Sequence, residues 1–115
     1  NMKQVIGQQG EVRIVKIDAL PKMETKPVEK HGNSYIISHS ESGHHHVLTG
    51  GNVMERTNGV PAGMQIFYAI LKEPQSLIQD AAVPHAGFDL APGFYEFRIS
   101  REFNPFSDQA RRVAD

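Results

Sequence analysis

The sequence predicts an all-β fold, a small and mainly antiparallel β-sandwich or barrel. Short runs rich in β-branched and aromatic residues recur along the chain, and turns containing Gly or Pro separate them at intervals of roughly 8–12 residues. The 115 residues suffice for one hydrophobic core and are too few for two. Because no repeat or low-complexity segment interrupts the pattern, we expect residues 2–115 to form a single β domain.

Composition excludes several classes of function. Twelve Lys and Arg oppose thirteen Asp and Glu, a net charge of -1, so we expect no binding to nucleic acid or to an anionic membrane. The absence of cysteine excludes disulfides, thiolate catalysis and cysteine-based zinc sites. No apolar run reaches the roughly 18 residues that cross a bilayer, and the N-terminus lacks a signal-peptide pattern. We therefore expect a soluble protein, cytoplasmic or associated with a virion.

The first strand is expected at residues 11–17, after a short apolar lead at residues 2–6 and a turn at residues 7–10. Its apolar side chains fall on both faces, so the strand is either buried on both sides or carries a bulge. Residues 18–30 hold two prolines among charged side chains, which excludes a helix or a central strand. We expect a surface loop there, with at most a short edge strand.

The second half of the chain predicts further strands. Residues 53–57 form a short strand, and residues 64–72 are the most apolar run, predicted to be a strand with both faces buried. Residues 94–103 alternate, with Tyr95, Phe97 and Ile99 facing inward and Glu96, Arg98 and Ser100 facing outward. This alternation predicts a half-buried antiparallel strand, and Ser107 can cap a short helical turn at residues 108–113.

Residues 34–39 and 44–48 are predicted to pair as a β-hairpin that holds four of the six histidines and one carboxylate. These side chains are His39, Glu41, His44, His45 and His46. Imidazole and carboxylate are the ligands that zinc and its neighbouring transition metals bind. The hairpin therefore predicts a divalent-metal site, with zinc as the expected metal.

The length of the hairpin loop decides which side chains share a face, because a one-residue change of register turns every side chain over. A two-residue or four-residue loop puts His39, His44 and His46 on one face. Glu41 then lies on that face or beside it. A three-residue loop moves His39 to the other face and places Ser40 and Ser38 opposite His44 and His46. The sequence leaves these alternatives open.

His44 and His46 form a His-x-His pair, which puts two imidazoles on one face of a strand. The third ligand is expected from one of three residues: His85, His39 or Glu41. His45 points to the opposite face and is not expected to bind the metal. The alternative is that all these side chains are solvated hairpin residues that bind no metal.

Other patterns are weaker. The charged side chains at residues 96–102 could bind an anion, but a solvated strand face explains them as well. Ser40 and Ser42 lie near histidines without a Gly-x-Ser-x-Gly elbow or an orienting acid. The turns at residues 50–52 and 61–63 lack the strand-to-helix setting of a phosphate loop. No nucleotide cofactor is therefore expected.

In a β-rich chain, His-x-His followed later by another histidine resembles the cupins, whose members often hold a metal with two histidines, a glutamate and a third histidine. The resemblance implies that the sandwich or barrel could be cupin-like. It is partial, because Gly50 and Gly51 stand where the cupin glutamate is expected, and Ile66 stands where the histidine after its Pro-x-Gly motif is expected.

The chain more closely resembles a set of uncharacterised short bacterial and phage proteins. Their pattern is Glu-x-x-Gly-His-x-His, then His-x-x-x-x-Leu, Pro-Gly-x-Tyr and a closing Arg-Glu-aromatic. This chain carries the pattern at residues 41–46, 85–90, 92–95 and 101–103, with Glu41 two rather than three positions before Gly43. The resemblance implies that His44, His46 and His85 belong to one constellation.

Two functions from different classes remain. The first is a metal-binding β protein with His44, His46 and His85 as ligands, which an open coordination position would make a hydrolytic or redox enzyme. Glu41 would be its fourth ligand or general base. The second is a non-catalytic interaction or assembly module, in a phage particle or a homo-oligomer, whose histidines lie at an interface or respond to pH. The sequence identifies neither a substrate nor a small-molecule ligand.

Overall fold

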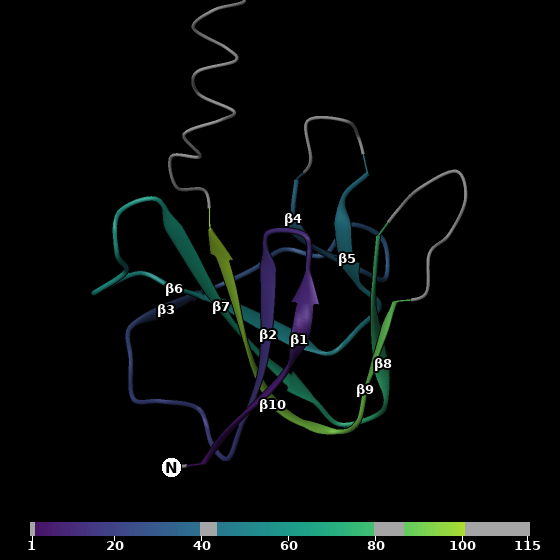
Figure 1. Cartoon of the computed structure of the whole chain (residues 1–115), viewed down its shortest axis with the longest axis horizontal. Coiled ribbons are helices and arrows are strands. Elements are labelled where there is room, and N and C mark those ends of the chain that lie inside the picture. Colours follow the sequence, from purple (N-terminus) through teal and green to yellow (C-terminus); the bar gives the residue numbers. More distant parts are fainter. Residues whose placement is uncertain (1, 40–43, 80–86, 101–115) are drawn as a thin grey trace, which may run out of the picture.

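The computed structural model describes residues 2–39, 44–79 and 87–100, which form two antiparallel sheets (Figure 1). One sheet has six strands in the order β1-β2-β10-β7-β6-β3, and the other has four in the order β4-β5-β8-β9. The strands are β1 Lys3–Gln9, β2 Val12–Ile17, β3 Thr25–Pro27, β4 Tyr35–Ser38, β5 His46–Leu48, β6 Asn52–Arg56, β7 Met64–Leu71, β8 Gln75–Gln79, β9 Phe88–Leu90 and β10 Gly93–Ser100.

The main hydrophobic core lies between the two sheets. Both sheets contribute large buried side chains to it, among them Ile14, Phe67 and Phe97 from one sheet and Ile37, Leu48 and Leu77 from the other. The predicted all-β sandwich is therefore confirmed, and the described strands form two sheets rather than a closed barrel. The helical turn predicted at residues 108–113 lies outside the described residues. Across the described ranges, no helix has the length and apolar character needed to span a membrane.

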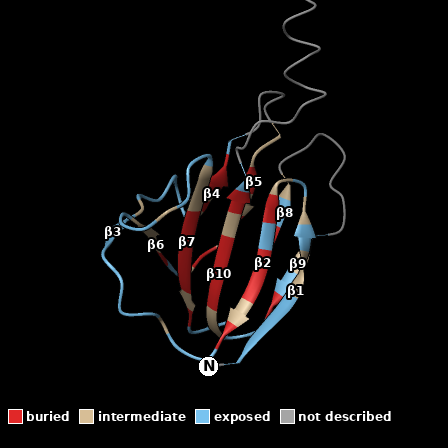
Figure 2. Ribbon diagram, turned by 60° about the vertical axis from the view of Figure 1, so that its left-hand side comes forward, coloured by how far each residue is buried: buried red, intermediate tan, exposed pale blue. Residues whose placement is uncertain are grey.

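The central strands of the six-stranded sheet are buried on both faces (Figure 2). A second apolar cluster covers the outer face of this sheet, formed by Val15, Ile17, Ile66 and Tyr68. This confirms two-sided burial for the strand predicted at residues 64–72, which ends one residue earlier, at Leu71. For residues 11–17 it selects burial on both sides over a bulge. Residues Tyr95, Phe97 and Ile99 are buried as predicted.

The expectation of a half-buried strand at residues 94–103 fits Arg98, which is partly exposed, and Ser100, which is exposed, but it is wrong at Glu96. Glu96 does lie on the outer face, but it is only 3% exposed. It pairs with Val15 of β2 on one side and with Tyr68 of β7 on the other, and both are buried members of the outer cluster. Alternation in the sequence predicts which face a side chain is on, but not how deeply its neighbours on the paired strands bury it.

Strand β1, which precedes the first strand predicted from the sequence, was not expected, because residues 7–10 look like a turn. Instead β1 continues through Gly7 with a bulge between Val5 and Gly7, and the chain turns at Gly10, where φ is 56°. A side chain at Gly7 would collide with the ring of Phe88 on β9, since an added Cβ would lie 2.5 Å from it. Glycine here thus permits a close approach between the sheets. The short edge strand expected within residues 18–30 is present as β3, paired with β6.

Gly51 provides a test of the packing between the turn before β6 and strand β7. Its φ is 99°, and an added Cβ would lie 2.5 Å from Leu71 Cδ2 and 3.0 Å from the backbone oxygen of Ile70. We expect Gly51→Ala to lower the free energy of unfolding by about 3 kcal/mol in urea denaturation, combining backbone strain with overpacking.

Gly32→Ala is the matched control, because Gly32 also has a positive φ of 65° but no atom lies within 4 Å of its added Cβ. It should cost only the backbone strain, about 1 kcal/mol. Equal losses in the two variants would contradict the proposed packing at Gly51.

Candidate functional site

The register of β4 against β5 determines how the histidines are arranged. Ser38 pairs with His46, Ile36 with Val47 and Tyr35 with Leu48, with a register shift between Ile36 and Ser38. This is the alternative in which Ser38, not His39, lies opposite His46. The loop residues 40–43 themselves lie outside the described residues.

His46 is buried between the two sheets and uses both ring nitrogens within the protein. Its side chain is 1% exposed, with Nδ1 2.7 Å from Gln9 Oε1 and Nε2 3.2 Å from Glu11 Oε1. Gln9 Nε2 donates to the Leu77 carbonyl at 3.0 Å, so this amide presents its oxygen to the imidazole and Nδ1 is the donor. A metal ion at His46 would have to displace Gln9 or Glu11.

Glu11 joins this network at the turn between β1 and β2. Its Oε1 accepts a hydrogen bond from Ser38 Oγ at 2.6 Å and faces His46 Nε2. Burial alone would raise the pKa of Glu11. The hydrogen bonds from Ser38 and from its own backbone, with the charge and hydrogen bond of His46, hold this pKa below the ordinary value of 4.5.

The hydrogen bonds among Ser38, Glu11 and His46 stabilise the fold and do not form a nucleophile–base pair. Ser38 donates to the carboxylate of Glu11 and not to His46, so the hydroxyl is not aligned for activation by the imidazole. The polar groups instead connect the β1–β2 turn of one sheet to β4 and β5 of the other. Sequence reasoning missed Gln9 and Glu11, which lie 37 and 35 residues from His46, because nothing in the sequence signals their approach.

His39 and His45 form the second group of the histidine-rich end. Their ring centroids are 4.9 Å apart with an angle of 71° between the ring planes. This contact agrees with the observed register, which would place His39 opposite His45 if continued by one residue beyond Ser38 and His46. His45 was not expected to bind the metal, and nothing in this contact tests that expectation.

Of the remaining predicted ligands, His44, Glu41 and His85, the structure describes only His44. His44 is half-buried, and its carbonyl accepts a hydrogen bond from Gln79 Nε2 at 3.5 Å. Glu41 and His85 lie outside the described residues, as do Ser40 and Ser42. Among the side chains that the structure describes, no group of three or more His, Asp or Glu is arranged to hold a metal. The metal site therefore stays a prediction.

The fold and this end of the molecule define a class: small antiparallel β-sandwich proteins with a histidine-rich end on one strand pair. A family model described as "Domain of unknown function (DUF8820)" matches residues 8–100, and the chain belongs to this family. No curated protein and no solved structure matches the chain. The likeness to cupins therefore rests on the spacing of the histidines.

The Glu11 network predicts a specific loss of stability in acid. Since the pKa of Glu11 in the folded state lies below its unfolded value near 4.5, its stabilising effect is present above that value. It is lost as the pH falls through the folded-state pKa. We expect the free energy of unfolding, measured in urea from about pH 7 to about pH 3, to fall less steeply on acidification in Glu11→Gln than in the wild type.

Ser38→Ala should also reduce the acid dependence, because it removes a hydrogen bond that lowers the Glu11 pKa. Glu29→Gln, a change at an exposed carboxylate, serves as the control and should follow the wild-type curve. The same pH dependence in Glu11→Gln and wild type would contradict this role for Glu11.

Proposed function

We propose that this protein binds a divalent transition metal, zinc in the first place, at the end of the β4–β5 pair that adjoins residues 40–43. The supporting observation is the 4.9 Å separation of the His39 and His45 ring centroids. With zinc–nitrogen distances of about 2.0–2.1 Å and tetrahedral angles, two imidazoles on one ion have centroids roughly 5 Å apart. The separation of the observed pair supports His39 and His45 as two ligands of one ion.

Three further residues are candidates for the other ligands. Two are close in sequence to His39 and His45, and the third is grouped with them by the resemblance to the bacterial and phage proteins. His44 adjoins His45, Glu41 lies in the segment between the two strands, and His85 belongs to the same constellation in the bacterial and phage proteins that the chain resembles. His46 has a different role in this proposal. Its hydrogen bonds to Gln9 and Glu11 hold β5 in the register that brings His39 and His45 together.

Such a site could support hydrolysis if one coordination position stayed open. A zinc-bound water becomes acidic enough to supply hydroxide near neutral pH, and Glu41 would act as the general base. If all four positions were filled by protein side chains, the metal would instead stabilise the fold. The ligand count therefore separates a catalytic role from a structural one.

Metal analysis of protein purified without an affinity tag tests the proposal. We expect about one zinc per chain by elemental analysis, and a melting temperature that rises with zinc and falls with a chelator. The double variant His39→Ala/His45→Ala should lose the metal and the zinc-dependent shift, because it removes two of the proposed ligands.

Glu73→Gln is the control, since Glu73 is an exposed carboxylate between β7 and β8, whereas it is the other end of β8, at Gln79, that pairs with His46. It should keep the metal. Retention of zinc by the double variant would exclude His39 and His45 as ligands. Absence of metal, with a melting temperature insensitive to zinc and chelator, would sink the proposal and favour the non-catalytic interaction module.

A further inference from the structure

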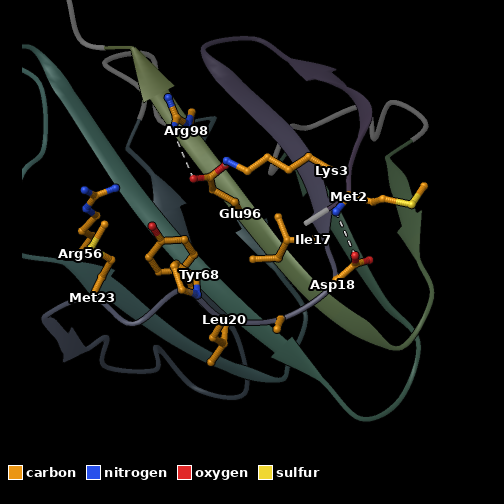
Figure 3. A pocket seen from close by; sticks show the side chains of 12 residues that line it. Met2, Lys3, Ile17, Asp18, Leu20, Met23, Arg56, Tyr68, Glu96 and Arg98 are labelled. Carbon is orange, nitrogen blue, oxygen red and sulfur yellow. Dashed lines mark hydrogen bonds and ion pairs between the residues drawn. The ribbon is translucent and has the colours of Figure 1, made fainter.

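We propose that the outer face of the six-stranded sheet carries a second, independent site, which binds a small carboxylic acid with an apolar body. A cavity of about 300 Å³ lies there, between the sheet and the loop that follows β2 (Figure 3). Its volume is at the lower end of the range of about 300–1,000 Å³ found for ligand pockets. The cavity therefore suits a small molecule rather than a nucleotide or a large cofactor.

Tyr68 supplies the first observation. Its side chain, on the central strand β7, is 2% exposed and lines the cavity. Within the described part of the chain, its hydroxyl has no hydrogen-bond partner. Figure 3 shows this hydroxyl directed toward the side of the cavity where Arg56 and Arg98 lie. Because buried hydroxyls are nearly always hydrogen-bonded, an unpartnered one facing a cavity indicates a missing acceptor or donor.

The charges around the cavity indicate that the missing group is an anion. Three cationic side chains line it, Lys3, Arg56 and Arg98, against two carboxylates, Asp18 and Glu96. Both carboxylates already have partners. Glu96 lies 3.8 Å from Lys3 Nζ and 3.4 Å from Arg98 Nη2, and Asp18 accepts a hydrogen bond from the Met2 backbone at 2.9 Å.

Arg56 is the cationic side chain that has N–H donors left to bind an anion. Its Nε donates to the Asn58 carbonyl at 2.7 Å, and no carboxylate of the described residues forms an ion pair with it. The guanidinium keeps further N–H donors, in a planar fork that matches a carboxylate. An acid bound between Arg56 and the Tyr68 hydroxyl would use both unsatisfied groups.

The strand register brings these groups to one face of the sheet. On β7, Tyr68 pairs with Met54 of β6 on one side and with Glu96 of β10 on the other. Arg56, two residues after Met54, therefore points to the same face one row further along. The polar groups thus gather on neighbouring strands about 4.8 Å apart.

The apolar part of the cavity defines the rest of the ligand. Ile17 at the end of β2, with Leu20 and Met23 from the following loop, contributes hydrophobic walls. Figure 3 shows Leu20 and Met23 on the loop side and Ile17 on the sheet. A ligand with a carboxylate at one end and an aromatic or branched aliphatic group at the other would match both parts.

Isothermal titration with 4-phenylbutyrate tests the site, with 4-phenyl-1-butanol as the uncharged analogue of similar shape. We expect the acid to bind saturably with a Kd of about 0.1–1 mM, and the alcohol to bind at least about tenfold more weakly because it cannot pair with Arg56. Absence of saturable binding by the acid, or equal affinity for the alcohol, would overturn the proposal.

Two variants separate binding from folding. Tyr68→Phe removes a hydroxyl without an internal partner, so the melting temperature should stay the same or rise while affinity for the acid falls about tenfold. Arg56→Gln should weaken binding by a similar factor. Arg13→Gln, which changes an exposed arginine on β2 outside the cavity lining, should bind like the wild type.

The variants also define how the proposal fails. A lower melting temperature in Tyr68→Phe would show that the hydroxyl has a structural partner after all. Unchanged affinity in both Tyr68→Phe and Arg56→Gln would place any binding elsewhere on the molecule. Zinc content should be the same in all these variants, because the cavity lies on different elements from the histidine-rich end.

Discussion

The buried imidazole of His46 is the interaction on which the arrangement of the histidine-rich end depends. It lies on β5 of the four-stranded sheet and contacts Gln9 and Glu11 at the β1–β2 turn of the other sheet. A buried polar group that loses one partner costs about 1–3 kcal/mol, so these contacts strongly favour one placement of β5. Ser38, opposite His46 on β4, donates to the same Glu11 carboxylate and extends the constraint to the neighbouring strand.

This constraint sorts the histidines into two groups with different chemistry. His46 is turned into the interior, whereas His39 and His45 lie together at the end of the strand pair. A histidine whose two ring nitrogens face protein acceptors serves the fold, so the proposed metal ligands are the other histidines of this end. The proposed metal site and the cavity over β7 are thus built from separate elements, and each can be tested without disturbing the other.

Much of the fold could be predicted from local sequence because it depends on local pattern. The apolar residues on both faces of β2 and β7 indicated two-sided burial, and the inward side of β10 followed from alternation. Strand β1 was missed because Gly7 and its neighbours have the composition of a turn. The burial of Glu96 could not be predicted, since strand pairing sets it between Val15 and Tyr68 of the outer cluster.

The candidate metal site was predictable only in part, because its ligands depend on the register of β4 against β5, and a shift of one residue changes them. The sequence identified the hairpin and its histidines, but the irregularity between Ile36 and Ser38 sets the register, and a shift of one residue exchanges His46 for His45 as the partner of His39. The partners of His46 come from a turn more than thirty residues away. Likewise, the sequence does not show that Tyr68 and Arg56 lie on one face of the sheet, because this depends on how β6, β7 and β10 pair.

The most direct test of the role of His46 is a proton–nitrogen correlation spectrum of the histidine rings by NMR. A proton bound to Nδ1 of His46, exchanging slowly with water and close to the Gln9 side chain, is the predicted result. An Nδ1 without a proton, or one whose proton exchanges as fast as that of an exposed histidine, would contradict the account.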